Sequence, residues 1–234
     1  MQWDVIWDRA RADLVITTAR GDEDVLLWEH SARVAQNARQ IVGIAEVVAT
    51  GADEAAVVVA ALYHEAGWMA RLKRGEIDPA DIFVRSTHDD HREEGSAMLE
   101  RSMAKLLPGD SLTRALHAVR AMDDRHTDRG DALALMDADH LDEFGVISLW
   151  PTVRKGLVDG RGVQAAIETW RRRKEYRFWE ARLRDSFHFD AVRDVARSRL
   201  AQLDEVMQVL AEQQEGSDLA RQLRSDRATD AALS

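Results

Sequence analysis

The chain of 234 residues contains no cysteine. Disulfide bonds, thiolate metal sites and cysteine nucleophiles are therefore excluded, because each of them needs a thiol. A metal ion in this protein would have to be held by histidine, aspartate and glutamate. Such a donor set suits Mn, Fe, Mg, Co or Zn and does not choose among them.

The chain also lacks long apolar runs, a basic N-terminus and an excess of positive charge. The chain has no run of about 18 apolar residues, so we expect no transmembrane helix. It begins Met1-Gln2-Trp3-Asp4, with an acid where a signal peptide carries bases, and we expect a cytoplasmic protein. The formal net charge of −10 disfavours a nucleic-acid partner, since binding phosphates needs a local excess of positive charge.

Only three prolines interrupt a chain in which 45% of the residues are hydrophobic, and apolar residues recur at helical spacing along most of it. We expect Asp53 to cap a helix whose stretch 55–63 is apolar on every side and therefore buried at the centre. A strand is the alternative for this stretch, but no other segment predicts a strand partner. The expected helices are 2–18, 23–48, 54–70, about 89–107, 110–125, 132–145, 161–184 and 189–213. The fold class is thus all-α, with one helical domain over residues 1–214 and a disordered tail over residues 215–234.

The strongest candidate for chemistry is the pair His64-Glu65 at the end of the buried helix. Burying a carboxylate beside an imidazole is costly unless a partner satisfies both groups, and a divalent cation is the simplest partner. The alternative is a pair just beyond the core, exposed at the helix end. His30, on an amphipathic helix, and Asp139, within an apolar helical run, add two further metal-ligand types. Each of these taken alone has an ordinary interpretation as a satisfied or solvated group.

Taken in order, these residues resemble the ligand pattern of the HD superfamily of metal-dependent phosphohydrolases. Residues 30–34 read HSARV, similar to the family's H-S-x-R-V. Residues 60–65 read AALYHE, similar to A-A-L-x-H-D, and residues 138–141 read ADHL, similar to A-D-x-L. Residues 137–145 resemble the small stand-alone bacterial members in particular. The resemblance covers about residues 20–210 and implies a single HD-type helical bundle domain.

The resemblance also implies one or two divalent ions. Dinuclear members carry two additional histidines, and His91 and His126 fall at similar places, although His88 competes with His91. The polar segment 87–91 is also compatible with a solvated loop. The complete set of implied metal ligands is His30, His64, Glu65, His91, His126 and Asp139.

The chain departs from the family at Glu65, where the family has aspartate. Glutamate is longer by one methylene, about 1.5 Å, so the bridging mode and the place of a bound water would change. After the pair, many members carry a lysine or acids, whereas this chain has Trp68 and Met69, which form an apolar wall. Lys73 and Arg74 come later and offer positive charge, although a solvated loop is the favoured interpretation for both.

Three functions follow from these observations. The first is hydrolysis of a small anionic substrate, a phosphate ester or nucleotide, by a metal-activated water. In that hydrolase the catalytic residues would be Glu65, Asp142 and Lys73, with Glu94 and Arg33 as alternatives for proton transfer and for holding the phosphate. The second is an HD-type mixed-valent diiron oxygenase that cleaves a small organic substrate with O2. The third is a degenerate HD domain that acts as a non-catalytic binding module.

The segment 170–179 mixes bases with aromatic residues. The favoured interpretation is one solvated helix face whose aromatic side chains pack inward. The alternative is a surface that meets an anionic substrate, a nucleic acid or an acidic patch of a partner.

Overall fold

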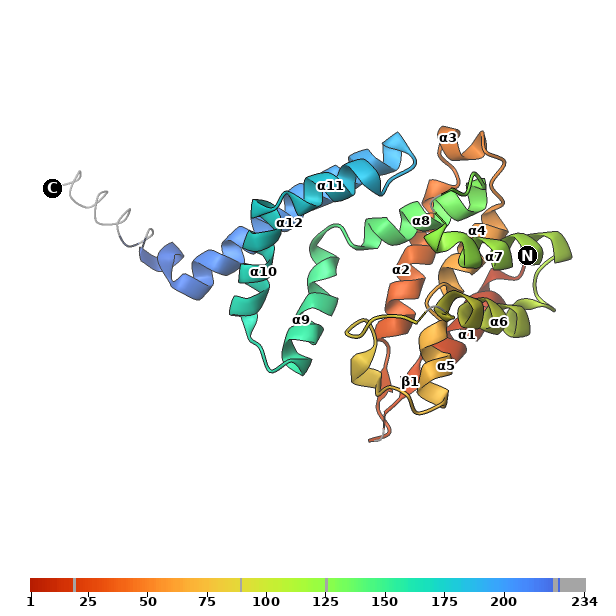
Figure 1. Ribbon diagram of the computed structural model, residues 1–234, viewed down its shortest axis with the longest axis horizontal. Helices are drawn as coiled ribbons and strands as arrows, with labels where there is room; N and C mark the ends of the chain where they lie inside the picture. Colours follow the sequence, from red (N-terminus) through yellow and green to blue (C-terminus); the bar gives the residue numbers. More distant parts are fainter. Residues whose placement is uncertain (19, 89, 125, 221–222, 224–234) are drawn as a thin grey trace. The chain divides into compact units, whose positions relative to one another are not determined.

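A computed structural model describes residues 1–18, 20–88, 90–124, 126–220 and 223. Its contacts divide the chain into two units, Met1–Glu143 with Asp185–Val195, and Phe144–Arg184 with Ala196–Ser234. Within the described residues the structure is helical apart from one ribbon of two short strands, which confirms the predicted all-α class (Figure 1).

The first unit is built around α4 (Glu54–Tyr63), as the apolar stretch predicted. Its residues 56–63 are completely buried, since a helix that is apolar on every side has no face for solvent. Asp53 caps the helix, because its side chain accepts a hydrogen bond of 2.7 Å from the backbone N–H of Ala56. The neighbours of α4 include α2 (Leu26–Ile41), α7 (Gly109–Arg120) and α8 (Gly130–Asp142) (Figure 1).

The first unit contains six further helical elements among its described residues. They are α1 (Trp3–Leu14), α3 (Ala45–Val48), α5 (Gly67–Lys73), α6 (His91–Met103), and the 3-10 turns η1 (Pro79–Asp81) and η2 (Ala121–Asp123). The prediction of one helix over 54–70 is wrong at the pair His64-Glu65, because α4 ends at Tyr63 and α5 begins at Gly67.

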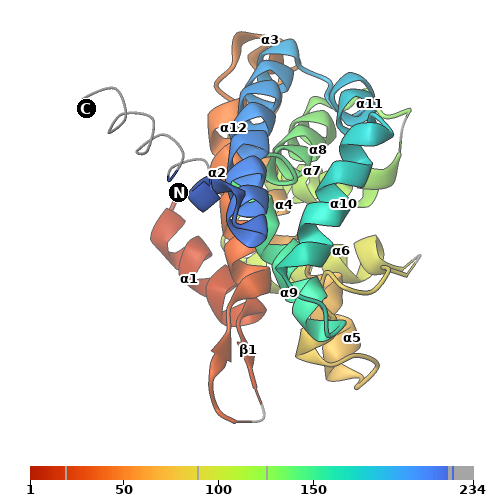
Figure 2. The same ribbon diagram turned by 90° about the vertical axis from the view of Figure 1, so that its left-hand side faces the viewer.

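The prediction of a helix over 2–18 is also wrong at its end. After Leu14 the chain forms β1 (Ile16–Thr17), which pairs antiparallel with β2 (Glu23–Asp24). Two β-branched residues favour the extended conformation in β1, and Gly21 adopts a φ of +88° in the intervening turn. Figure 2 shows this hairpin at the bottom, beyond the end of α1.

The second unit contains η3 (Val146–Ser148), α9 (Leu149–Val158), α10 (Val163–Glu175) and α11 (Phe178–Asp185), and α12 (Asp190–Glu215) runs into it from the first unit. The predicted helix 161–184 breaks where Arg177 adopts a φ of +53°. The rings of Trp170 and Trp179 are buried, with centroids 5.6 Å apart. The inward packing expected for segment 170–179 is thus confirmed for its tryptophans and is wrong for Tyr176 and Phe178, which are exposed.

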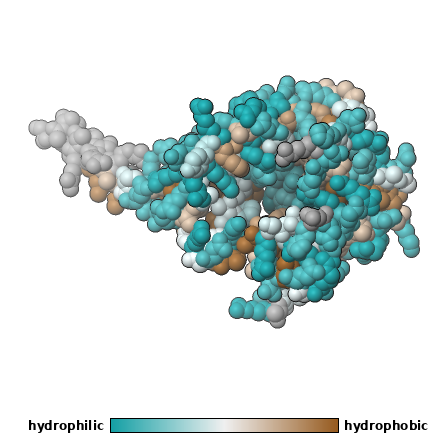
Figure 3. Space-filling view, in the orientation of Figure 1, coloured by the Kyte–Doolittle hydropathy of each residue, from teal (hydrophilic) through white to brown (hydrophobic). Residues whose placement is uncertain are grey.

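Two expectations stay predictions. One is a single domain over residues 1–214. The other is a disordered tail over residues 215–234, of which residues 221–222 and 224–234 lie outside the described part of the chain. None of the helices in the described residues is long and apolar enough to cross a membrane. Hydrophilic side chains cover most of the face seen in Figure 3.

Candidate metal centre

Side chains from three helices of the first unit meet at one point. They are His30 on α2, His64 at the C-terminal cap of α4, and Asp139 on α8. The Nε2 atoms of His30 and His64 are 3.2 Å apart. Asp139 Oδ1 lies 3.2 Å from His64 Nε2 and 3.5 Å from His30 Nε2. Among the described residues this is the group of histidine and carboxylate ligand atoms, all within 4.8 Å of one another, that has the form of a metal site.

The outer hydrogen bonds of the two imidazoles determine which nitrogen carries the proton. His64 Nδ1 is 2.7 Å from the carbonyl oxygen of Ala61, which can only accept, so Nδ1 donates. His30 Nδ1 donates in the same way to Asp142 Oδ2 at 2.9 Å. In their neutral forms both rings therefore direct an Nε2 lone pair toward the oxygen of Asp139. Three electron-pair donors this close repel one another unless a cation lies between them, so the donor set fits a divalent metal.

The charges at the centre agree with this assignment. Burial lowers the pKa of His30, but the hydrogen bonds and negative charges of Asp139 and Asp142 outweigh it and raise the pKa to about 10. Burial raises the pKa of Asp139, yet the neighbouring His64 and His30 hold that pKa well below its ordinary value. In the absence of a metal, a proton on His30 thus supplies the positive charge that the other two groups require.

Asp142 is hydrogen-bonded to His30 and is not one of the three proposed ligands. Its carboxylate accepts the Nδ1–H of His30 and two hydrogen bonds from Arg33, of 3.0 and 3.1 Å. Burial raises the pKa of Asp142, but His30 and Arg33 lower it below its ordinary value, so the group is an anion. A carboxylate in this position orients a ligand histidine and increases its basicity.

Glu65 contributes no atom to the group of three ligands. Its Oε2 accepts hydrogen bonds from Trp68 Nε1 at 2.8 Å and from His91 Nε2 at 3.1 Å. Its Oε1 accepts one from Arg92 Nη1 at 2.8 Å. Burial raises the pKa of Glu65, but His91 and Arg92 hold it below the ordinary value, so the buried carboxylate is charged. We refer to Glu65, Trp68, His91 and Arg92 as the Glu65 network.

Two glycines allow α5 and α6 to approach closely enough for the hydrogen bonds of the Glu65 network to form. A Cβ on Gly67 would lie 2.4 Å from the carbonyl oxygen of His91 and 2.6 Å from its Nδ1, closer than atoms can approach. A Cβ on Gly95 would lie 3.1 Å from the carbonyl oxygen of Tyr63. The start of α5 and the first turns of α6 therefore pack against each other and against the end of α4, and this packing brings His91 to Glu65.

The remaining predicted residues lie elsewhere. His126 is exposed in a turn, where its backbone N–H donates to Asp124. Lys73 and His88 are exposed. Glu94 forms an ion pair with Arg74, and its Oε2 is buried without a hydrogen-bond partner among the described residues.

Sequence reasoning missed two residues at the centre. Arg92 is the counter-charge of Glu65, and its position beside His91 was the available signal. Phe83 adopts a φ of +60°, and its ring centroid lies 4.9 Å from that of His30. The ring centroids of Phe83 and Trp68 are 6.3 Å apart, and the two rings form an apolar wall beside the centre. The contribution of Trp68 to the expected apolar wall is thus supported, Phe83 adds to it, and that of Met69 stays a prediction.

The first unit is a helical bundle that presents a His-His-Asp centre suited to a divalent cation. The family model described as HD domain matches residues 27–144, just over half of the chain and all three ligands. The chain therefore belongs to the HD domain family. This membership supports a metal-dependent phosphohydrolase in general.

The comparison with solved structures supports this fold through a match to one of them, YpgQ. Bacillus subtilis YpgQ, solved in complex with ADP, is 20% identical to this chain with a TM-score of 0.56, and the match covers 91% of this chain and 97% of YpgQ. A protein described as a predicted HD superfamily hydrolase from an uncultured Thermotogales bacterium is 19% identical with a TM-score of 0.49, covering 88% and 90% of the two chains. None of the curated proteins matches this chain.

Proposed function

We propose that this chain is a metal-dependent phosphohydrolase that holds one divalent ion through His30, His64 and Asp139 and acts on a small phosphate ester or nucleotide. The observation that carries the proposal is the convergence of two Nε2 lone pairs and one carboxylate oxygen. A bound ion would lower the pKa of a water molecule and polarise a phosphoryl oxygen.

The residues of the chain support an anionic substrate. Two neutral imidazoles and one carboxylate leave a divalent ion with one uncompensated positive charge, which favours a phosphate over a neutral ligand. Asp142 and Arg33 keep the ring of His30 aimed at the ion through hydrogen bonds of 2.9 to 3.1 Å. The complex of YpgQ with ADP is consistent with an anionic ligand of this kind.

The placement of Glu65 supports one ion instead of two. A second ion of the type that the family resemblance implies would need Glu65 and His91 as ligands. Here these two side chains are hydrogen-bonded to each other, and the same carboxylate also accepts hydrogen bonds from Arg92 and Trp68. The same placement favours the hydrolase over the diiron oxygenase, which needs two ions.

The test combines metal analysis with a substrate panel. Protein treated with a chelator is assayed on nucleotides and phosphate esters before and after Mn, Fe, Mg, Co or Zn is restored. We expect hydrolysis only with metal, close to one ion bound per chain, and loss of both in Asp139→Asn. His117→Gln, which changes an exposed histidine on α7, is the matched control and should behave as the wild type. Hydrolysis that persists after complete chelation would contradict the proposal.

A further inference from the structure

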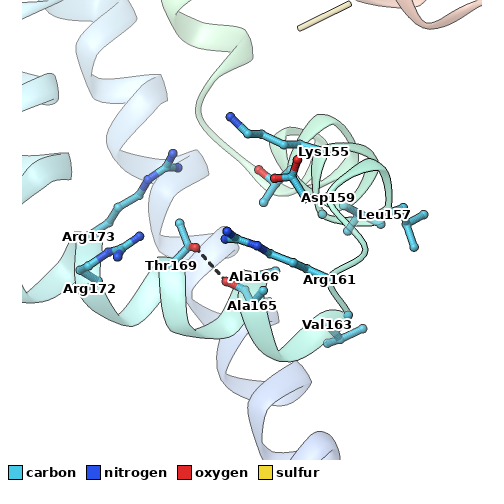
Figure 4. A pocket seen from close by; sticks show the side chains of 14 residues that line it. Lys155, Leu157, Asp159, Arg161, Val163, Ala165, Ala166, Thr169, Arg172 and Arg173 are labelled. Atoms are coloured by element: carbon cyan, nitrogen blue, oxygen red, sulfur yellow. Dashed lines mark hydrogen bonds between the residues drawn. The ribbon is translucent and has the colours of Figure 1, made fainter. Parts of the chain in front are cut away.

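A hollow of about 580 Å³ lies between α9 and α10 in the second unit (Figure 4). Its lining includes four basic side chains, Lys155, Arg161, Arg172 and Arg173, and one acid, Asp159. We call it the α9–α10 pocket. Basic side chains thus outnumber acidic ones in the lining, although the formal net charge of the whole chain is −10. Like charges gathered in one hollow repel, so the arrangement favours an anionic occupant.

Two of the arginines are available to a ligand. Figure 4 shows the side chains of Arg161 and Arg172 pointing toward Thr169 from opposite ends of the pocket. In the described part of the chain neither guanidinium forms a side-chain hydrogen bond or ion pair. Arg171, the neighbour of Arg172 on α10, instead pairs with Glu215 at 2.7 Å and lies outside this pocket.

The other groups of the pocket narrow the kind of ligand. The Thr169 hydroxyl donates to the carbonyl oxygen of Ala165 at 2.7 Å, so its proton is not free for an anion. The guanidinium of Arg173 is held over the rings of Phe178 and Trp179, with its Cζ 5.1 and 5.5 Å from the two centroids. The guanidinium groups of Arg161 and Arg172 offer planar pairs of N–H donors that match the oxygens of a phosphate.

We propose that the α9–α10 pocket binds a small phosphate-bearing anion through Arg161 and Arg172. The volume lies within the range of small-molecule sites. The exposed side chains of Leu157 and Val163 also line the pocket and offer contacts to an apolar part of such a ligand. The inference uses residues of the second unit alone and does not rest on the function proposed for the metal centre.

The test is calorimetric titration of the full chain with inorganic pyrophosphate after chelator treatment, in metal-free buffer. The wild type should bind pyrophosphate, and the double variant R161Q/R172Q should bind it at least about tenfold more weakly, given the strength of hydrogen bonds between charged groups. R171Q removes the same charge from the same helix outside the pocket and should change the affinity by less than about twofold. Since all three arginines are exposed, unchanged thermal unfolding should show that the variants remain folded.

A further variant, H64A, separates this pocket from the metal centre. Pyrophosphate binding that survives in H64A and weakens selectively in R161Q/R172Q supports the pocket. Three results would overturn it: no binding by the wild type, equal weakening in R171Q and R161Q/R172Q, or binding that is lost in H64A and kept in R161Q/R172Q. The last result would place the anion at the metal centre alone.

Discussion

Replacing Glu65 by glutamine tests whether the carboxylate of the His-Glu pair is a metal ligand. The substitution removes the charge that Arg92 and His91 face while preserving the shape of the side chain. Breaking a buried ion pair costs about 3 to 5 kcal/mol. Arg92 retains hydrogen bonds to the carbonyl oxygen of His64 at 3.0 Å and to Asp123 at 3.2 Å. We therefore expect the free energy of unfolding to fall by about 3 kcal/mol, at the lower end of that range.

The Glu65→Gln substitution should lower the stability of the protein but leave its metal binding nearly unchanged. An ion present at 100 times its dissociation constant stabilises the folded state by about 2.7 kcal/mol. If only His30, His64 and Asp139 bind the ion, Glu65→Gln should keep nearly all of this increment, although its baseline stability is lower. Asp139→Asn should lose the increment. The two effects are separated by denaturant unfolding of each variant with chelator and with metal in excess.

The result that would refute this reasoning is specific. If Glu65→Gln loses the metal-induced increment as completely as Asp139→Asn does, Glu65 is a ligand and the argument for a three-ligand, mononuclear centre fails. An Arg92→Gln variant gives a second check, since it weakens the Glu65 network and leaves the side chains of all three proposed ligands in place, although Arg92 also donates to the backbone carbonyl of His64. It should lower stability and keep the metal-induced increment.

Three further predictions follow from the same contacts. Asp142→Asn should weaken metal affinity by about 10- to 100-fold, because His30 loses the carboxylate that orients its ring. Competition with a chromophoric chelator measures the affinity. An unchanged affinity would contradict this role of Asp142. Metal binding at pH 8 should release close to one proton per ion, because the pKa of His30 is raised to about 10 and the ion replaces the proton on its imidazole. Calorimetric titrations in buffers of different ionisation enthalpy count the released protons. A count near zero would show that His30 is already neutral. Gly67→Ala should destabilise the protein by about 1 to 3 kcal/mol, since its Cβ would meet the backbone of His91. Gly43→Ala is the control, because its Cβ would make an ordinary contact of 3.5 Å. Denaturant titration of both variants should show a clearly smaller loss of stability for Gly43→Ala.

The core could be predicted from the sequence because its signals are local. The apolar stretch 55–63, the capping Asp53 and the histidine that follows the stretch describe α4 without knowledge of any other segment. His30, His64 and Asp139 could be named only as a set, because their order along the chain resembles the ligand pattern of the HD superfamily, whereas each taken alone has an ordinary interpretation. The orientation of Glu65 could not be predicted, because its side chain is placed by Arg92 and His91, which come from another helix. The ends of α1 and α4 were missed because short extended segments and a break at His64-Glu65 leave the apolar periodicity almost unchanged.

The spacing of the three proposed ligands along the chain has a consequence for how the first unit opens. His30, His64 and Asp139 come from α2, α4 and α8, so a bound ion would join three helices that are distant in sequence. No one of these helices could then detach without breaking a bond to the ion. The amide hydrogens of α2, α4 and α8 should consequently exchange with solvent as one cooperative group, and metal should slow that exchange in all three helices together.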